Sequence, residues 1–284
     1  IAGSTDNTAD ANVSGAIKKA VLTTNPLVWS TVAYTEQYPK SNTAFSHRIN
    51  AIEIDPAGQY IYLNSGSKSD HGEQVGGLRD VPLTAKIFRI PINANNLYLA
   101  NNASSLAGYI FCEGIRNTFG LAFDPNGNLF GVENSGDRDH PEEMNWLQQG
   151  KHYGFPWTMG GLDNPQQFPS YNPGTSNGSW SNNPSLDPFI QASLSIGWVS
   201  GYFYNDPTFP STPTGVTFTG PVLNDGPDAD YYRDPADNTI KQASSTGKAV
   251  ATFSPHLSPT GLTFDYGTNL NSTFSGDAFA VNYN

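Results

Sequence analysis

Three residues that can bind ligands or move protons stand at matching positions ahead of three similar segments. The pairs, separated by 8, 8 and 9 residues, are His47 with Asp55, Arg116 with Asp124, and His256 with Asp265. A neutral imidazole can take up a proton near neutral pH, and a guanidinium can hold a carboxylate or a carbonyl of a ligand. A single such residue could simply stabilise a loop by hydrogen bonding. Three at matching positions predict a common site.

Two polar loops add possible ligands. Asn117 follows Arg116 directly and offers an amide beside the charged fork. Residues 133–139 (Glu-Asn-Ser-Gly-Asp-Arg-Asp) are rich in oxygen atoms, which suits Ca²⁺, although the spacing is not that of an EF-hand and an exposed acidic turn is the alternative. Residues 67–73 form a second polar loop, which follows the apolar segment at 49–67 as the loop 133–139 follows the next apolar segment. The two loops are therefore expected to be neighbours.

The segments that would position these residues read as β-hairpins. Residues 49–67, 114–137 and 260–281 each contain an apolar strand, a turn that begins with Asp and a second apolar strand. Asp124 follows Asp55 by 69 residues and precedes Asp265 by 141, close to twice 69. This spacing predicts an all-β fold, a β-propeller with one degenerate repeat between the second and third hairpins. Equivalent positions in a closed ring would meet around its axis, where pockets form.

A single domain is expected over residues 1–284, with a long loop insertion at about 160–205 that is dense in Gly, Pro, Asn and Ser. That loop either roofs the channel of the ring or is a surface excursion. Short helical turns are expected within 15–20 and 142–149, and a strand over 86–92.

Composition narrows the function classes. The net charge of −11 and the isoelectric point near 4.7 argue against nucleic acid as a partner. The sequence contains no run of about 18 apolar residues of the kind that would predict a membrane-spanning helix. Cys112 is the single cysteine, so an intrachain disulfide is excluded. Four possible N-glycosylation sites favour an extracellular, secreted protein: Asn12, Asn102, Asn177 and Asn271. No signal peptide precedes Ile1, which predicts a mature chain or a fragment.

Several blocks together resemble one family. Residues 114–123 (Gly-Ile-Arg-Asn-Thr-Phe-Gly-Leu-Ala-Phe), with Asp-Pro-Asn-Gly at 124–127, are similar to the Gly-x-Arg-Asn-x-x-Gly-Leu block of soluble PQQ-dependent sugar dehydrogenases. Residues 142–145 (Glu-Glu-Met-Asn) and 150–156 (Gly-Lys-His-Tyr-Gly-Phe-Pro) resemble the blocks that follow it in that family. Residues 65–73 look closest to the sorbosone and pyranose dehydrogenase branch.

The resemblance implies a six-bladed propeller that carries PQQ and Ca²⁺ over its central channel. It implies that His47 is the general base for the C1 hydroxyl of an aldose or pyranose, and that Arg116 and Asn117 contact PQQ. Hydride passes to the quinone while Ca²⁺ polarises it. The implied partners are a sugar and an electron acceptor.

Two metal sites follow from the same resemblance. Ser135 and Gly136 match the loop whose backbone carbonyls bind the catalytic Ca²⁺, although the Gly-Pro of the glucose dehydrogenases is missing here. Glu143 and Tyr153 match a structural Ca²⁺ site.

The chain also departs from the family at both ends. It has few residues before His47 for the first blade or blades, and it stops at 281–284, where the family continues into a strand with further basic residues. A chain truncated at both ends is therefore expected. A non-catalytic extracellular propeller, serving as a binding or structural module, is the alternative function. A calcium-dependent lactonase-type propeller would need inward-facing carboxylates on several blades, and the sequence shows no such set.

Overall fold

The structure is a computed structural model that describes residues 2–5, 11–40, 47–74, 76–136, 140–168, 206–224, 231–233, 240–242, 250–267, 270 and 272–283. Most regular structure in these residues is β. The exceptions are α1 (Ala103–Leu106) and the 3₁₀ turns η1 (Pro165–Gln167) and η4 (Ser272–Phe274). None of the described helices is long and apolar enough to cross a membrane. Most of the predicted loop insertion, residues 169–205, lies outside the described residues.

The first sheet joins β1 (Ala2–Thr5), β2 (Asn12–Ala20), β3 (Trp29–Thr35) and β8 (Leu97–Leu99), and β4 (Tyr38–Pro39) also pairs with β2. Four of its five strands precede His47 in the chain, so these residues do supply one sheet. The helical turn predicted within 15–20 is wrong. Those residues belong to β2, in which Val13, Gly15 and Ile17 are buried and their neighbours are not, the period-two pattern of a strand.

The second sheet has the order β5 (Ile49–Ile54), β6 (Tyr60–Ser65), β7 (Lys86–Pro91) and β9 (Ile110–Glu113), and the third has the order β10 (Thr118–Phe123), β11 (Leu129–Glu133) and β12 (Glu143–Leu147). The strand predicted over 86–92 is confirmed by β7. The helical turn predicted within 142–149 is wrong, because β12 pairs with β11 along its whole length and buries alternate residues.

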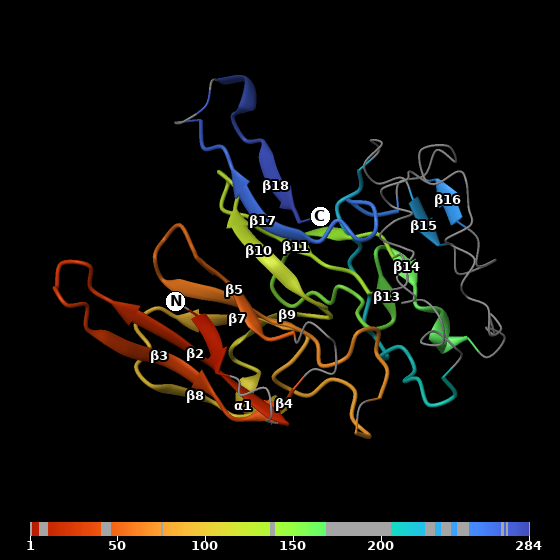
Figure 1. Ribbon diagram of the computed structural model, residues 1–284, viewed down its shortest axis with the longest axis horizontal. Coiled ribbons are helices and arrows are strands. Elements are labelled where there is room, and N and C mark those ends of the chain that lie inside the picture. Colours follow the sequence, from red (N-terminus) through yellow and green to blue (C-terminus); the bar gives the residue numbers. More distant parts are fainter. Residues whose placement is uncertain are drawn as a thin grey trace.

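The third hairpin consists of β17 (Pro259–Phe264) and β18 (Ala278–Asn282). In Figure 1 the sheets follow one another as an open fan, and β10 packs against β5 on one side and β17 on the other. The degenerate repeat predicted between the second and third hairpins is therefore wrong. Among its described residues, the intervening chain instead contributes two small sheets outside this row: β13 (Thr158–Met159) with β14 (Leu162–Asp163), and β15 (Tyr231–Arg233) with β16 (Ile240–Gln242).

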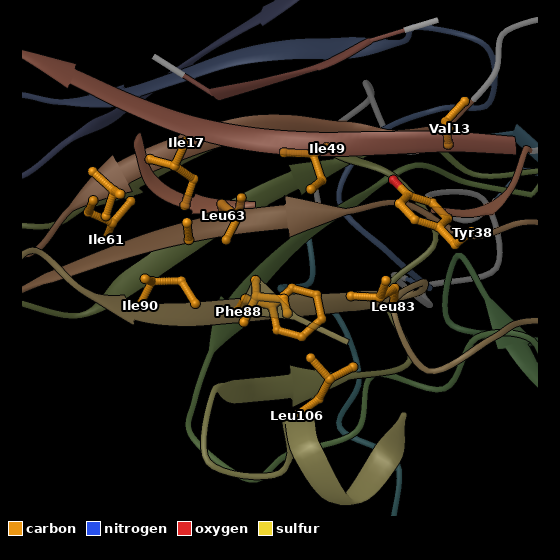
Figure 2. Close-up of a cluster of buried hydrophobic side chains, with 13 residues drawn as sticks. Val13, Ile17, Tyr38, Ile49, Ile61, Leu63, Leu83, Phe88, Ile90 and Leu106 are labelled. Atoms are coloured by element: carbon orange, nitrogen blue, oxygen red, sulfur yellow. The ribbon is translucent and has the colours of Figure 1, made fainter. Parts of the chain in front are cut away.

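Apolar side chains fill the spaces between the sheets. One cluster joins the first two sheets: Ile17 on β2 packs with Leu63 and Phe88, which lie on the neighbouring strands β6 and β7 (Figure 2). A second cluster joins the second and third sheets. In it the Tyr62 ring packs edge-on against the rings of Phe111 and Phe123, with distances of 4.9 and 5.4 Å between the ring centroids. Each large side chain buried in this way contributes about 1.5–3 kcal/mol. These contacts fix the first strands of neighbouring sheets side by side.

Candidate functional site

The residues at the starts of β5, β10 and β17 meet, as predicted. His47, Arg116 and His256 all line one cavity of about 320 Å³. A cavity of this size is at the lower end of the range for small-molecule sites. Asn117 and Ser135, two further residues expected at the site, lie in the same wall. The row of adjacent first strands therefore places residues from three distant segments around one space.

His47 is held in one protonation form by its neighbours. Its Nδ1 lies 3.0 Å from Ser67 Oγ, which donates its own hydrogen to the backbone oxygen of Ser69 at 2.6 Å. A hydroxyl has one hydrogen to give, so Ser67 Oγ accepts from His47 and Nδ1 carries the imidazole proton. The lone pair of His47 is then on Nε2, the nitrogen that can take up a proton.

Burial and charge keep this imidazole neutral. His47 is 5 % exposed. Burial, and secondly the positive charge of Arg116, lower the pKa of His47 to about 3, against the opposing effect of Asp70. The side chain is thus ready to accept a proton throughout the neutral range, but it is a weak base in this environment.

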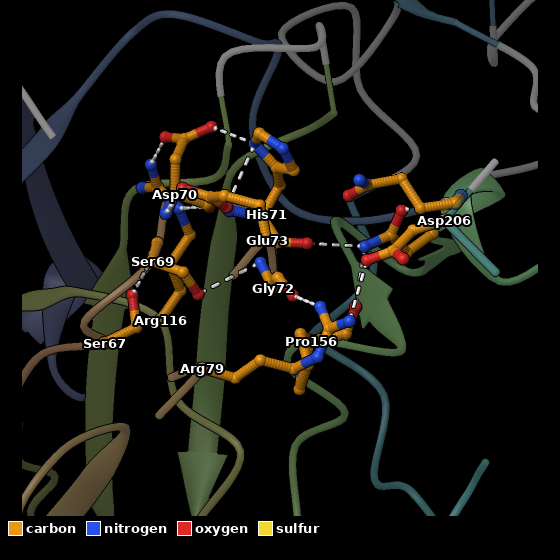
Figure 3. A network of polar contacts seen from close by, with 12 residues as sticks. Ser67, Ser69, Asp70, His71, Gly72, Glu73, Arg79, Arg116, Pro156 and Asp206 are labelled. Carbon is orange, nitrogen blue, oxygen red and sulfur yellow. Dashed lines mark hydrogen bonds and ion pairs between the residues drawn. The ribbon is translucent and has the colours of Figure 1, made fainter. Parts of the chain in front are cut away.

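Arg116 joins the two polar loops that were expected to be neighbours. Its Nε donates to the backbone oxygen of Asp70 at 2.7 Å, its Nη2 forms an ion pair with the Asp70 carboxylate, and its Nη1 donates to the backbone oxygen of Asn134 at 2.8 Å. Figure 3 shows Arg116 against Asp70 at one end of a polar network that continues through His71 and Gly72 to Arg79. The proximity of loops 67–73 and 133–136 is confirmed by these bonds.

A buried carboxylate sets the backbone of Arg116. Glu133 Oε1 accepts from the Arg116 N–H at 2.8 Å, and Oε2 accepts from Thr118 Oγ1 at 3.0 Å. Burial, followed by the charge of Glu143, raises the pKa of Glu133 to about 8. Arg116 is thus fixed through both its main chain and its side chain, and its positive charge lies in the wall of the cavity.

Asn117 is oriented by a chain of amides. Asn50 Nδ2 donates to Asn117 Oδ1 at 2.9 Å, and Asn50 Oδ1 in turn accepts from Asn64 Nδ2 at 2.7 Å. The oxygen end of the Asn117 carboxamide is therefore committed to the protein. Its amino end is the donor that Asn117 can offer a ligand.

The site's geometry can be set beside known proteins. The chain matches the family described as Glucose / Sorbosone dehydrogenase over residues 3–220. The chain belongs to the glucose/sorbosone dehydrogenase family. No curated protein matches the sequence.

Solved structures are similar at low sequence identity. The apo form of the soluble aldose sugar dehydrogenase of Escherichia coli is 16% identical with a TM-score of 0.49, and the match covers 98% of this chain and 60% of that one. A calcium structure of a Trichoderma reesei carbohydrate-active enzyme of family AA12 is 16% identical with a TM-score of 0.45, covering 96% and 61%. The holo PQQ domain of pyranose dehydrogenase from Coprinopsis cinerea is 14% identical with a TM-score of 0.43, covering 94% and 57%. The chain thus spans about 60% of the first of these structures.

Of the residues that the family resemblance assigned to metal ions, Ser135 lies at the cavity beside Gly136, and Glu143 and Tyr153 do not line it. Ser135 lines the cavity, and its hydroxyl donates to the backbone oxygen of Pro141. Gly136 lies beside it, where a Cβ would come within 3.4 Å of the Asp70 backbone oxygen and 3.3 Å of Met159 Sδ. This loop is therefore closely packed against the loop that contains Asp70.

Glu143 and Tyr153 are not brought together. Glu143 accepts from the Gly160 N–H at 2.6 Å and from Asn145 Nδ2 at 2.8 Å, at the start of β12. The Tyr153 hydroxyl donates to the Trp146 backbone oxygen at 2.5 Å, at the other end of the same strand. Their shared metal role stays a prediction.

Asn134 and Glu142 are among the cavity residues that sequence reasoning missed. Asn134 Oδ1 and Glu142 Oε2 are buried side-chain oxygens without a hydrogen-bond partner among the described residues. A signal for them was present in the sequence, because Asn134 belongs to the polar loop 133–139 that was expected to hold ligands and Glu142 begins the block at 142–145. What was missing was the strand pairing that turns both into the cavity wall.

Proposed function

We propose that this chain forms the site of a PQQ- and Ca²⁺-dependent sugar dehydrogenase, which oxidises the C1 hydroxyl of an aldose or pyranose with His47 as general base. The observation that carries the proposal is that His47, Arg116 and Asn117 line one cavity in a member of the glucose/sorbosone dehydrogenase family. The neighbours' printed descriptions, which mention aldose sugar, pyranose, PQQ and calcium, agree with it.

The residues present fit a planar, anionic quinone and a hard cation. Arg116 places a buried positive charge in the wall, and Asn117 offers an amide donor for a carbonyl or carboxylate. The backbone carbonyls of Ser135 and Gly136 would hold Ca²⁺, because this hard cation binds oxygen ligands. When bound, PQQ supplies the two-electron acceptor for the hydride.

The chain's own residues would handle the proton. His47 Nε2 carries the lone pair, so it accepts the proton of the sugar hydroxyl as the C1 hydride leaves. Ser67 holds the imidazole in this tautomer. Asp70 stabilises the imidazolium that forms, because its negative charge raises the pKa of His47. Burial in the cavity wall keeps water away from this proton transfer.

The proposal includes further expectations about the fold, a second metal site and the location of the protein. The row of sheets would be part of a six-bladed propeller, with Glu143 and Tyr153 at a structural Ca²⁺ site. The protein would be secreted, glycosylated at one or more of Asn12, Asn102, Asn177 and Asn271, and would deliver its electrons to an external acceptor.

The proposal is tested by reconstituting the chain with PQQ and Ca²⁺ and measuring aldose-dependent reduction of an artificial electron acceptor. We expect His47→Gln to lower kcat by about 10²–10⁴-fold while PQQ binding stays intact. PQQ binding without turnover of any aldose or pyranose would remove the catalytic proposal and favour a non-catalytic binding module.

A further inference from the structure

Glu142 is a buried carboxylic acid in the cavity wall to which the mechanism above gives no role. Burial raises the pKa of Glu142 to about 8, so the group is mostly neutral at pH 7. Its side chain is 3 % exposed, and its Oε2 has no hydrogen-bond partner among the described residues. Leaving a buried carboxyl oxygen without a hydrogen-bond partner costs free energy. A ligand in the cavity can supply the missing hydrogen-bond partner.

The main chain at residues 256–258 binds the carboxyl group of Glu142. The backbone N–H groups of His256 and Ser258 both donate to it. These two residues have positive φ angles of 64° and 47°, a left-handed conformation that non-glycine residues rarely adopt. Strained backbone of this kind concentrates at functional sites. The carboxyl group is thus held from one side, which fixes the direction of its remaining lone pairs.

Asn134 lines the same cavity as Glu142. Glu133 pairs with Glu143 at the end of the β11–β12 ladder, so the next position along each strand is Asn134 on one and Glu142 on the other. Asn134 Oδ1 is the second buried, unpartnered oxygen of the cavity. Two buried oxygens without a partner therefore lie in the lining of one cavity, one position beyond the same end of the β11–β12 ladder.

The chemistry of this pair favours neighbouring hydroxyl groups as its ligand. Calcium takes about six to eight oxygen ligands, and two side-chain oxygens are few for it. A carboxyl oxygen and an amide oxygen in one cavity lining can bond to hydroxyl groups on adjacent carbon atoms, which is how the hydroxyls of a sugar ring are arranged. We propose that Glu142 and Asn134 recognise two neighbouring hydroxyls of the sugar and so determine which sugar the cavity accepts. This inference rests on the proposed function, because it assumes a sugar as the substrate.

The experiment measures equilibrium binding of D-glucose, D-galactose and D-mannose by saturation-transfer NMR, on the cofactor-free chain and on the chain loaded with PQQ and Ca²⁺ without electron acceptor. The sugar that binds best is then compared with its monodeoxy derivatives. Glu142→Gln keeps the side-chain volume and one oxygen for the backbone donors but replaces the second oxygen with an amino group. Glu53→Gln, on β5 and outside the cavity lining, is the matched control.

We expect Glu142→Gln to weaken binding by about 2–10-fold, the loss for one hydrogen bond between neutral groups. The variant should also lose the discrimination between the sugar and one of its monodeoxy derivatives, which a merely structural role would preserve. Asn134→Ala should remove discrimination at the adjacent hydroxyl, and Glu53→Gln should change neither.

Three results would overturn the inference. They are no saturable binding of any of the three sugars by the wild type, unchanged discrimination in both cavity variants, and loss of Ca²⁺ affinity in Glu142→Gln with sugar binding unchanged. PQQ binding, measured by calorimetry on the same samples, reports on the proposed function separately.

Discussion

The two ends of the same hairpins are built in different ways. At the turn end, Asp55 and Asp124 each accept hydrogen bonds from backbone N–H groups two to five residues later, so each turn is completed by its own residues. At the start of β10, Arg116 is held by Asp70, 46 residues away, and by its own sheet through Glu133. The turn end follows from local sequence, whereas the cavity end exists only when distant segments are packed together. The cavity end should therefore be the more sensitive to substitution.

Arg116→Ala should show the largest effect. It removes one partner of a buried ion pair and leaves the Asp70 carboxylate with an uncompensated charge, so we expect about 3–5 kcal/mol less free energy of unfolding in urea denaturation. Arg89→Ala is the matched control, because Arg89 lies half-buried over the Tyr60 ring at 4.8 Å and should cost no more than about 1 kcal/mol. Equal losses in the two variants would contradict the comparison.

The acid stability of the chain should depend on His47. The unfolded chain titrates near the ordinary value of 6.5 and the folded chain near a pKa of about 3, so the unfolded state binds the proton more tightly. The stability from neutral His47 is complete above pH 6.5 and is lost as pH falls towards 3, by up to about 1.4 kcal/mol per pH unit.

Replacing this residue isolates its contribution. His47→Gln should show a shallower loss of unfolding free energy between pH 6 and 4 than the wild type, measured by denaturant titration at each pH. Comparing the variant with the wild type cancels the titration of Glu133 and Glu142, whose raised pKa values act in the opposite direction. Parallel profiles would show that His47 is not buried in its neutral form.

The contact between β10 and β17 should tolerate little added volume. A Cβ on Gly120 would lie 2.9 Å from the Leu262 backbone nitrogen and 2.9 Å from Val132 Cγ2. Gly120→Ala should therefore cost about 1–3 kcal/mol of unfolding free energy and lower the melting temperature. Wild-type stability in this variant would show that the two strands are not packed as described.

A substitution in a turn should cost least. Gly127 has a φ of 82° with open space where a Cβ would stand, so the cost of Gly127→Ala is the left-handed conformation alone, about 1 kcal/mol. Gly108→Ala, also in open space, has no positive φ to maintain and should be close to neutral. A thermal unfolding series on the two variants measures the difference.

Sequence reasoning succeeded where interactions are local or repeated. The strands of the three hairpins and the convergence of His47, Arg116 and His256 followed from alternation and from equal spacing. It failed at residues 15–20 and 142–149, because short segments with mixed polarity become strands only through the neighbours with which they pair. The degenerate repeat was wrong since sequence spacing cannot distinguish an inserted loop from an inserted blade.

At the site, residue types could be predicted but directions could not. The sequence pointed to His47 as a base, but its tautomer depends on Ser67, which lies 20 residues further along the chain. Glu142 was passed over because its place in the cavity depends on the pairing of β12 with β11 and on the backbone at His256 and Ser258.

The most direct test of the central claim is calorimetric titration of the chain with PQQ in the presence of millimolar Ca²⁺, on the wild type and on Asn117→Ala. Circular dichroism and thermal unfolding confirm that the variant is folded. We predict saturable binding of one PQQ per chain, weakened by about tenfold or more in the variant, as expected for the loss of an amide donor in the cavity wall. An absence of binding by the folded wild type, or equal affinity in the variant, would contradict the assignment of this cavity as the cofactor site.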